Sequence, residues 1–167
     1  TYYFKVEPIK WRVLESNDGT YKLLSDMILE NTEFYNLEVY EDELVIDNRI
    51  INDITIYANN YEYSNIRAWL NGYDGTSYNV SDYTNKGFID IAFTEEERKI
   101  INSTLVDNSL TSTGYSANSY VCNDTTDKIY LLSYKDATNT NYGFNSDESS
   151  RAIVSDYARS KNCSIDA

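Results

Sequence analysis

The sequence predicts a small α+β domain, with a hairpin near its N-terminus, two to three helices and long polar loops around a small antiparallel sheet. An Asp-Gly pair separates two alternating apolar segments, which is typical of a hairpin. Ser64–Tyr73 carries apolar residues at helical spacing, and β-branched segments elsewhere alternate with loops rich in Asn, Ser and Thr. A length of 167 residues fits one domain over 1–167 with a substantial core.

The hairpin is predicted to have strands over Tyr2–Glu15 and Tyr21–Ser25, joined at Asp18-Gly19. Asp-Gly favours this turn because both residues tolerate positive φ angles. In the first strand the apolar positions shift by one residue at Glu7-Pro8, which predicts a bulge or break there. The apolar residues expected to share a face after this shift are Ile9, Trp11 and Val13.

Residues 26–63 are expected to form a long, mostly loop-like excursion with one short strand within Leu44–Ile56. Such an insertion is a natural place for binding. Polar loops are also expected over 74–85, 102–126 and 137–149. Asp127–Ser133 is apolar on both faces, so it is predicted to be a central strand.

Ser64–Tyr73 is the clearest predicted helix, with Ser64 as N-cap and Gly72 at its end. Its apolar stripe consists of Ile66, Trp69, Leu70 and Tyr73, and Arg67 and Asn71 lie off this stripe. Thr94 and Glu97 form a predicted capping box, which explains the three consecutive glutamates better than a metal or catalytic cluster does. Ser150–Lys161 is predicted to be a last helix, and its expected inward residues are Ile153, Val154, Tyr157 and Ala158.

The charge balance disfavours several classes of partner. The chain has 27 acidic and 14 basic side chains, a net charge of −13. Nucleic acids and anionic lipids are recognised through Lys and Arg, so binding to either is not expected. No apolar segment is long enough to cross a bilayer. The acidity agrees with a solubility role or a cation-rich environment.

No catalytic constellation is recognisable. The chain has no histidine, which removes the commonest general base and every Ser-His or Cys-His pair. Hydrolysis by paired carboxylates remains chemically open, but no spacing singles out a pair. Cys122 and Cys163 form no metal-binding pattern, and they are either thiols or a disulfide in an oxidising compartment.

Calcium is the most reasonable metal, because its ligands are carboxylate, amide and carbonyl oxygens. Asn145–Glu148 and Asn123–Asp127 are the two candidate segments, and both also read as solvated turns without the spacing of a calcium-binding loop. No other cofactor is expected. Tyrosine is abundant, with 17 residues, and Tyr with Asn and Ser makes adaptable recognition surfaces. Candidate positions for sugar stacking are Tyr40, Tyr57, Tyr61, Tyr63 and Tyr78.

Five segments together, in their order and spacing, resemble an uncharacterised bacterial domain family common in secreted and surface proteins of gut and oral bacteria. These segments are Phe4–Leu14, Ser64–Asn71, Phe93–Glu97, Asp127–Ser133 and Asp156–Ala158. The family usually continues with Trp-Trp-Leu-Arg-Ser-Pro and Val-Arg-Pro-Ala-Leu-Trp segments. Those endings resemble the C-type-lectin-like core shared with formylglycine-generating enzymes.

This sequence contains neither ending, so the resemblance implies either a C-type-lectin-like domain that lacks its C-terminal third or one whose end was removed or left unread. Formylglycine-generating activity would need reactive cysteines in that missing region, so the resemblance gives no such role to Cys122 or Cys163. The family has no established activity, and no functional residue is carried over from it.

The expected function is a non-catalytic binding or structural module of a bacterial surface or secreted protein, with a glycan or protein as ligand. The resemblance and the Tyr-, Asn- and Ser-rich loops favour this interpretation. A carboxylate-dependent hydrolase and a structural part of a larger assembly are the alternatives. A deep pocket with two carboxylates of raised pKa would favour the hydrolase.

Overall fold

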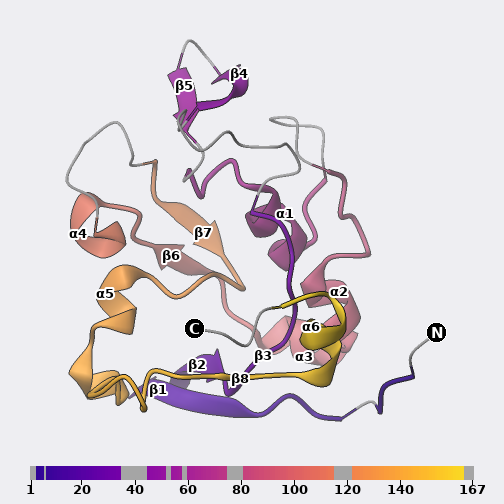
Figure 1. Cartoon of the computed structure of the whole chain (residues 1–167), viewed down its shortest axis with the longest axis vertical. Helices are drawn as coiled ribbons and strands as arrows, with labels where there is room; N and C mark the ends of the chain where they lie inside the picture. Colours follow the sequence, from indigo (N-terminus) through magenta and orange to yellow (C-terminus); the bar gives the residue numbers. More distant parts are fainter. Residues whose placement is uncertain are drawn as a thin grey trace. The chain divides into compact units, whose positions relative to one another are not determined.

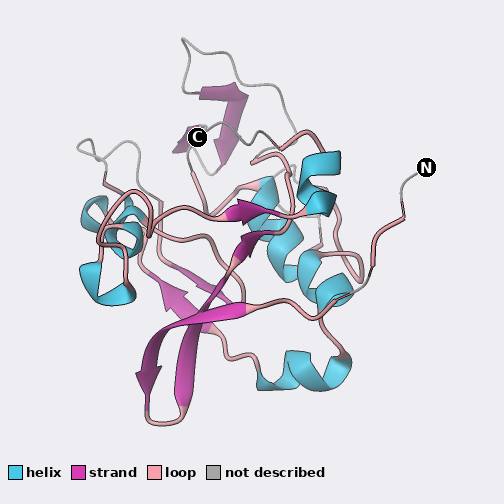
Figure 2. Cartoon of the chain, turned by 60° about the horizontal axis from the view of Figure 1, so that its bottom comes forward, coloured by secondary structure: helices cyan, strands magenta, loops and turns pink. Residues whose placement is uncertain are grey.

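The computed structural model describes residues 3–5, 7–34, 45–51, 54–57, 60–74, 81–114 and 122–163. The chain divides into two compact units. We call residues 1–32 with 136–167 the terminal unit, and residues 33–135 the central unit. Both units contain helices and small two-stranded sheets (Figures 1 and 2), which confirms the α+β class.

The terminal unit is built from the two ends of the chain. Its elements are β1 (Trp11–Asn17), β2 (Thr20–Ser25), β3 (Met27–Ile28), the short 3-10 helix η2 (Thr140–Tyr142), β8 (Ile153–Val154) and α6 (Asp156–Ser160). The strands β1 and β2 pair antiparallel, whereas β3 and β8 form a short parallel pair that joins the two chain segments. The Asn31 side chain adds a link by donating to the Lys161 carbonyl.

The predicted N-terminal hairpin is confirmed. Asp18 and Gly19 have φ angles of 46° and 80°, as a two-residue turn of this kind requires. The first strand begins at Trp11, and its register shift falls at Leu14 instead of Glu7-Pro8. Leu14 is the buried residue of β1, whereas Trp11 and Val13 are 37% and 56% exposed, so the apolar face predicted for Ile9, Trp11 and Val13 is not the buried face of the strand.

The central unit contains two antiparallel strand pairs and a set of short helices. Its elements are β4 (Val45–Ile51), β5 (Ile54–Tyr57), α1 (Asn65–Asn71), α2 (Phe88–Ala92), α3 (Glu95–Ile100), β6 (Thr104–Val106), α4 (Leu110–Thr113) and β7 (Thr125–Asp127). The helix α5 (Tyr134–Ala137) begins in this unit and ends in the terminal unit. The pairs β4–β5 and β6–β7 are both antiparallel.

Two segments contain more regular structure than the sequence predicted. Residues 45–57 form two strands instead of one, and 102–126 contains β6, α4 and the start of β7. Six short α-helices occur in the described residues, more than the two to three expected. The elements β6, α4 and β7 have only three or four residues, too few for a hydrophobic periodicity to be detected.

The predicted helix at Ser64–Tyr73 is confirmed as α1. Ser64 accepts a hydrogen bond from the Arg67 amide, and Gly72 ends the helix in the left-handed region with φ 67°. The helix packs on α2 through Trp69 and Phe88, whose ring centroids lie 5.4 Å apart. Buried Leu70 and Ile89 extend this core.

The predicted capping box of α3 is also confirmed. The Glu97 amide donates to Thr94 Oγ1 at 3.3 Å, and the Thr94 amide donates back to Glu97 Oε2 at 2.7 Å. This exchange satisfies two backbone donors at the helix start. Hydrogen bonds from the backbone amide and the hydroxyl of Thr94 lower the pKa of the Glu97 carboxyl, although this carboxyl group is fully exposed.

Two further predictions need correction. Asp127–Ser133 is not a central strand, because β7 ends at Asp127 and Leu131 is 38% exposed. The last helix begins only after Ser155, and Ile153 lies in β8 with 72% exposure, whereas Val154 and Ala158 are buried as expected. Tyr157 is also on the exposed side. In the described residues, no helix is long and apolar enough to cross a membrane.

Candidate functional site

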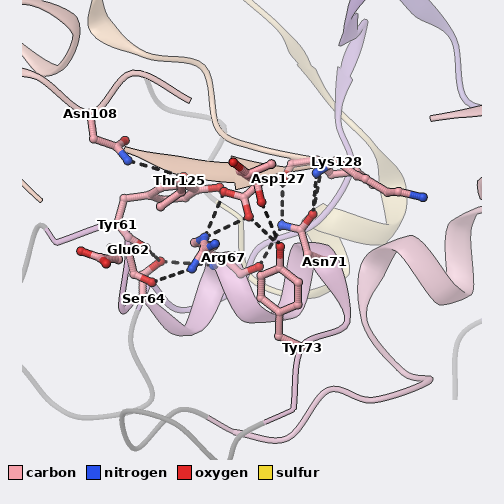
Figure 3. Close-up of polar contacts among 12 residues, drawn as sticks. Tyr61, Glu62, Ser64, Arg67, Asn71, Tyr73, Asn108, Thr125, Asp127 and Lys128 are labelled. Carbon is pink, nitrogen blue, oxygen red and sulfur yellow. Dashed lines mark hydrogen bonds and ion pairs between the residues drawn. The ribbon is translucent and has the colours of Figure 1, made fainter. Parts of the chain in front are cut away.

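A buried carboxylate lies at the centre of the polar network shown in Figure 3. The Asp127 side chain, at the end of β7, is 0% exposed. Both of its oxygens accept from Arg67 Nε, each at 3.0 Å, and Oδ1 also accepts from the Tyr73 hydroxyl at 2.8 Å. A buried carboxylate requires such partners, because an isolated charge away from water is costly.

Arg67 links the carboxylate to the start of α1. Its Nη1 donates to the Glu62 carbonyl at 2.9 Å, and its guanidinium lies 5.1 Å from the centre of the Tyr73 ring. Burial lowers the pKa of Arg67, but the hydrogen bond and charge of Asp127 outweigh this effect and raise it above its usual value. The guanidinium is therefore a permanent cation within the network.

Asn71, one helical turn after Arg67, holds the chain that leaves β7. Its Oδ1 accepts from the amides of Lys128 and Ile129 at 3.0 and 3.1 Å, and its Nδ2 donates to the Ile129 carbonyl at 2.9 Å. These bonds replace the strand pairing that the sequence predicted for this segment. The side chains of Arg67 and Asn71 thus attach residues 127–129 to α1.

A second polar layer covers the start of β7. The Glu62 carboxylate accepts from both the amide and the side chain of Asn123, at 3.2 to 3.3 Å. The side chain of buried Asn108 donates from Nδ2 to the Asn123 carbonyl at 2.9 Å. The backbone amide of Asn108 donates to Asp124 Oδ1, also at 2.9 Å. The candidate calcium segment Asn123–Asp127 therefore uses these side chains within the protein's own network.

Tyr61 brings a hydroxyl into the same region. Its side chain is 9% exposed, and its oxygen has no hydrogen-bond partner in the part of the chain that the structure describes. Burial, and then the negative charge of Asp127, raise the pKa of Tyr61 well above its usual value. The backbone of Leu131 acts to lower this pKa, but its contact with the Tyr61 hydroxyl does not have the geometry of a hydrogen bond.

Tyr73 titrates abnormally for related reasons. Burial and its hydrogen bond to Asp127 raise the pKa of Tyr73 to about 12. The phenol is therefore a hydrogen-bond donor to the carboxylate throughout the physiological range.

Of the five tyrosines predicted for sugar stacking, the structure describes the side chains of Tyr61 and Tyr63. Tyr61 is buried and Tyr63 is half-buried, beside the network. Tyr57 lies in β5, while Tyr40 and Tyr78 lie outside the described residues. Burial of the Tyr61 ring removes it as a stacking platform.

Both cysteines are thiols and not halves of a disulfide. Burial raises the pKa of the half-buried Cys122 thiol, and the backbone amides of Glu62 and Tyr61 only partly oppose this. A thiol with a raised pKa is a weak nucleophile, because the thiolate is the reactive form.

Carboxyl groups and metal ligands give no further site in the described residues. The carboxyl groups with a shifted pKa there are Asp82, Glu97 and Asp107, and hydrogen bonds to their own turns or caps lower all three. No cluster of three or more His, Cys, Asp or Glu side chains there is placed to hold a metal. The candidate calcium segment Asn145–Glu148 is a turn whose amides at 145 and 146 donate to Ser149 Oγ, each at 2.9 Å.

The sequence did not indicate that Arg67, Asn71 and Asp127 belong to one polar network. One available signal was that Arg67 and Asn71 are polar, lie one turn apart and fall off the apolar stripe of α1. The residues beside them in the helix, Ala68 and Leu70, are buried. Asp127 carried no signal, because its role depends on a contact 60 residues away in the sequence.

The α+β fold and this network define an acidic domain organised by a buried ion pair. The chain belongs to the family described as a domain of unknown function, DUF6273, whose pattern matches residues 18–166. This match confirms the expectation of an uncharacterised domain family. No curated protein and no solved structure matches the chain.

Proposed function

We propose that this domain is a non-catalytic binding or structural module of a bacterial surface or secreted protein, with a glycan or protein as ligand. A C-type-lectin-like fold is part of the proposal. It rests on the motif resemblance, whose segments include the helix α1, the capping box of α3 and Asp127.

The observation that carries the proposal is that the polar groups of the buried network bind one another and the backbone. Arg67, Asp127 and Tyr73 are partners of one another, and Asn71 binds backbone groups. A catalytic group must reach a substrate, whereas these groups contact other parts of the fold. This arrangement supports a rigid framework beneath an exposed recognition surface.

The surface nearest to this framework is formed by Asn123 and Asp124, both exposed, with half-buried Glu62 beside them. The side chains of Asn123 and Asp124 each make hydrogen bonds within the network and are also exposed to solvent. Their amide and carboxylate groups offer both donors and acceptors, which suits the hydroxyl groups of a glycan or the polar rim of a protein interface. Their backbone is held by Asn108, so a ligand would meet a preorganised segment.

The test is a binding screen of the full chain against immobilised glycans and bacterial surface proteins. Combined Asn123→Ala and Asp124→Ala substitution is expected to weaken binding to a captured ligand by about tenfold or more. The matched control is Lys99→Ala on α3, an exposed residue paired with Glu95, which should leave binding unchanged.

Absence of binding by the full chain to either class would contradict the proposal. The same samples should be assayed for hydrolysis of each glycan and protein. Turnover that disappears on substitution of carboxylates would favour the hydrolase instead. Localisation is tested separately, by finding the native protein in the cell-wall or secreted fraction of its source cells.

A further inference from the structure

Lys22 and Asp136 form a half-buried pair that differs from the other lysine pairs of the described residues. Lys22 Nζ lies 2.7 Å from Asp136 Oδ1, and the two side chains are only 24% and 16% exposed. The paired lysines Lys5, Lys99 and Lys135 have side chains that are 82%, 65% and 62% exposed. The Lys22 pair therefore lies in an environment where a charged pair is less well solvated.

Two further polar groups surround this pair. Glu15 is the cross-strand partner of Lys22 in the hairpin, so both side chains lie on the same face. Tyr142, from η2, donates its hydroxyl to Glu15 Oε2 at 2.9 Å, and its ring centre lies 5.3 Å from Lys22 Nζ. An amine, an acceptor carboxyl, a second carboxyl and a covering aromatic ring are thus brought together.

We propose that Lys22 and Asp136 condense to form an intramolecular isopeptide bond. The Lys22 ammonium first passes one proton to the Asp136 carboxylate. The freed Nζ lone pair then attacks Asp136 Cγ, a C–N bond forms, and one carboxyl oxygen leaves with two protons as water. Glu15 takes a proton from the attacking amine and returns one to the leaving oxygen, so no oxidant or cofactor is needed. Amide formation is unfavourable between separate molecules in water, but positioning within one fold supplies an effective molarity of up to about 10⁵ M or more.

The bond would join the two chain segments of the terminal unit. Lys22 belongs to the segment before the central unit and Asp136 to the segment after it. The non-covalent links between these segments include the two-residue pair β3–β8 and single hydrogen bonds such as that from Arg12 to the Ser149 carbonyl. A covalent link at this point would close the terminal unit against unfolding or pulling at its ends.

Intact mass spectrometry of the unfolded full chain tests the proposal. The wild-type chain is expected to be lighter than its sequence mass by one water molecule, with a branched Lys22–Asp136 peptide after digestion. Lys22→Arg keeps the ion pair but is expected to have the full sequence mass, because a guanidinium does not attack a carboxyl group. Asp136→Asn is expected to lose ammonia instead of water.

Glu15→Gln should slow the mass loss in a freshly purified sample, since it removes the proton-transferring carboxylate. Lys135→Ala, which alters the neighbouring exposed pair with Asp107, is the control that should retain the missing water. A wild-type chain at its full sequence mass overturns the proposal and leaves Lys22–Asp136 as an ion pair. A lighter chain whose branched peptide joins other residues overturns it as well.

Discussion

At the scale of single residues, the central unit contains a charge that can exist there only with its partner. Asp127 is fully buried and shares its oxygens between Arg67 and Tyr73. The gain from such a pair over two apolar residues is small, because both charges lose their water. Removing one partner, however, leaves the other buried and uncompensated, and this asymmetry is what mutations reveal.

Asp127→Asn is therefore expected to lower the free energy of unfolding by about 3–5 kcal/mol, since it leaves the Arg67 charge without its counterion. Urea denaturation measures this change. The control is Glu95→Gln, whose exposed pair with Lys99 is 70% and 65% accessible and should change stability by less than about 1 kcal/mol. Equal effects of the two substitutions would contradict the role of the network.

The two tyrosines of the network should respond oppositely to loss of their hydroxyl. Tyr61→Phe removes a buried hydroxyl without a partner in the described residues, so it is expected to raise the free energy of unfolding by about 1 kcal/mol. Tyr73→Phe removes a hydrogen bond to a carboxylate and is expected to lower it by about 1.5–3 kcal/mol. Destabilisation by Tyr61→Phe would mean that its hydroxyl has a partner.

Tyr73 also predicts a dependence of stability on alkaline pH. Its pKa is raised from 10.0 to about 12 in the folded chain. Between these values the unfolded chain releases the proton while the folded chain keeps it, so the free energy of unfolding falls as pH rises from 10 to 12. Tyr73→Phe should fall less steeply over that window, measured by denaturation at each pH, and an unchanged slope would contradict the assignment.

At the scale of elements, the close approach of α1 and α2 depends on two glycines. A Cβ added at Gly87, before α2, would lie 2.5 Å from Gly72 Cα and 2.6 Å from the Trp69 carbonyl oxygen. Gly87 itself has an ordinary φ of −70°, so its requirement for glycine arises from packing and not from the backbone angle.

Gly87→Ala is expected to lower the free energy of unfolding by about 1–3 kcal/mol, because the added methyl group forces the two helices apart. Its amide chemical shifts should change at Trp69 and Gly72. Gly143→Ala is the control: its φ of 89° makes alanine strained, but no atom lies within 4 Å of the added Cβ. Shifts at α1 caused by Gly143→Ala, or none caused by Gly87→Ala, would refute the contact.

At the scale of the whole molecule, the central unit carries all the partners of its network within residues 33–135. We therefore expect a fragment of residues 33–135 to unfold cooperatively on its own, as followed by circular dichroism on heating. Asp127→Asn should lower its melting temperature as it does in the full chain. A fragment without a cooperative transition would show that the terminal unit is needed for folding.

Local signals in the sequence predicted the elements with strong end signals. Asp18-Gly19 predicted the hairpin, Ser64 and Gly72 predicted α1, and Thr94 with Glu97 predicted the capping box of α3. Each depends on residues fewer than nine positions apart, so its physics is contained in a short segment. The short strands β6 and β7 lack such signals, because they are stabilised mainly by what lies beside them. The helix α4 has a Ser109 N-cap and a Gly114 end like those of α1, but its four residues are too few to show helical periodicity.

The sequence by itself therefore determined the α+β class, the acidic character, the N-terminal hairpin, α1 and the capping box of α3. Only the tertiary structure decided that Asp127 ends a strand and lies buried against Arg67, and that Leu14 is the buried residue of β1. The physical reason is the distance along the chain over which each interaction acts. Capping and turn preferences act within one turn of chain, whereas the burial of a charge depends on a partner that only the fold brings within 3.0 Å.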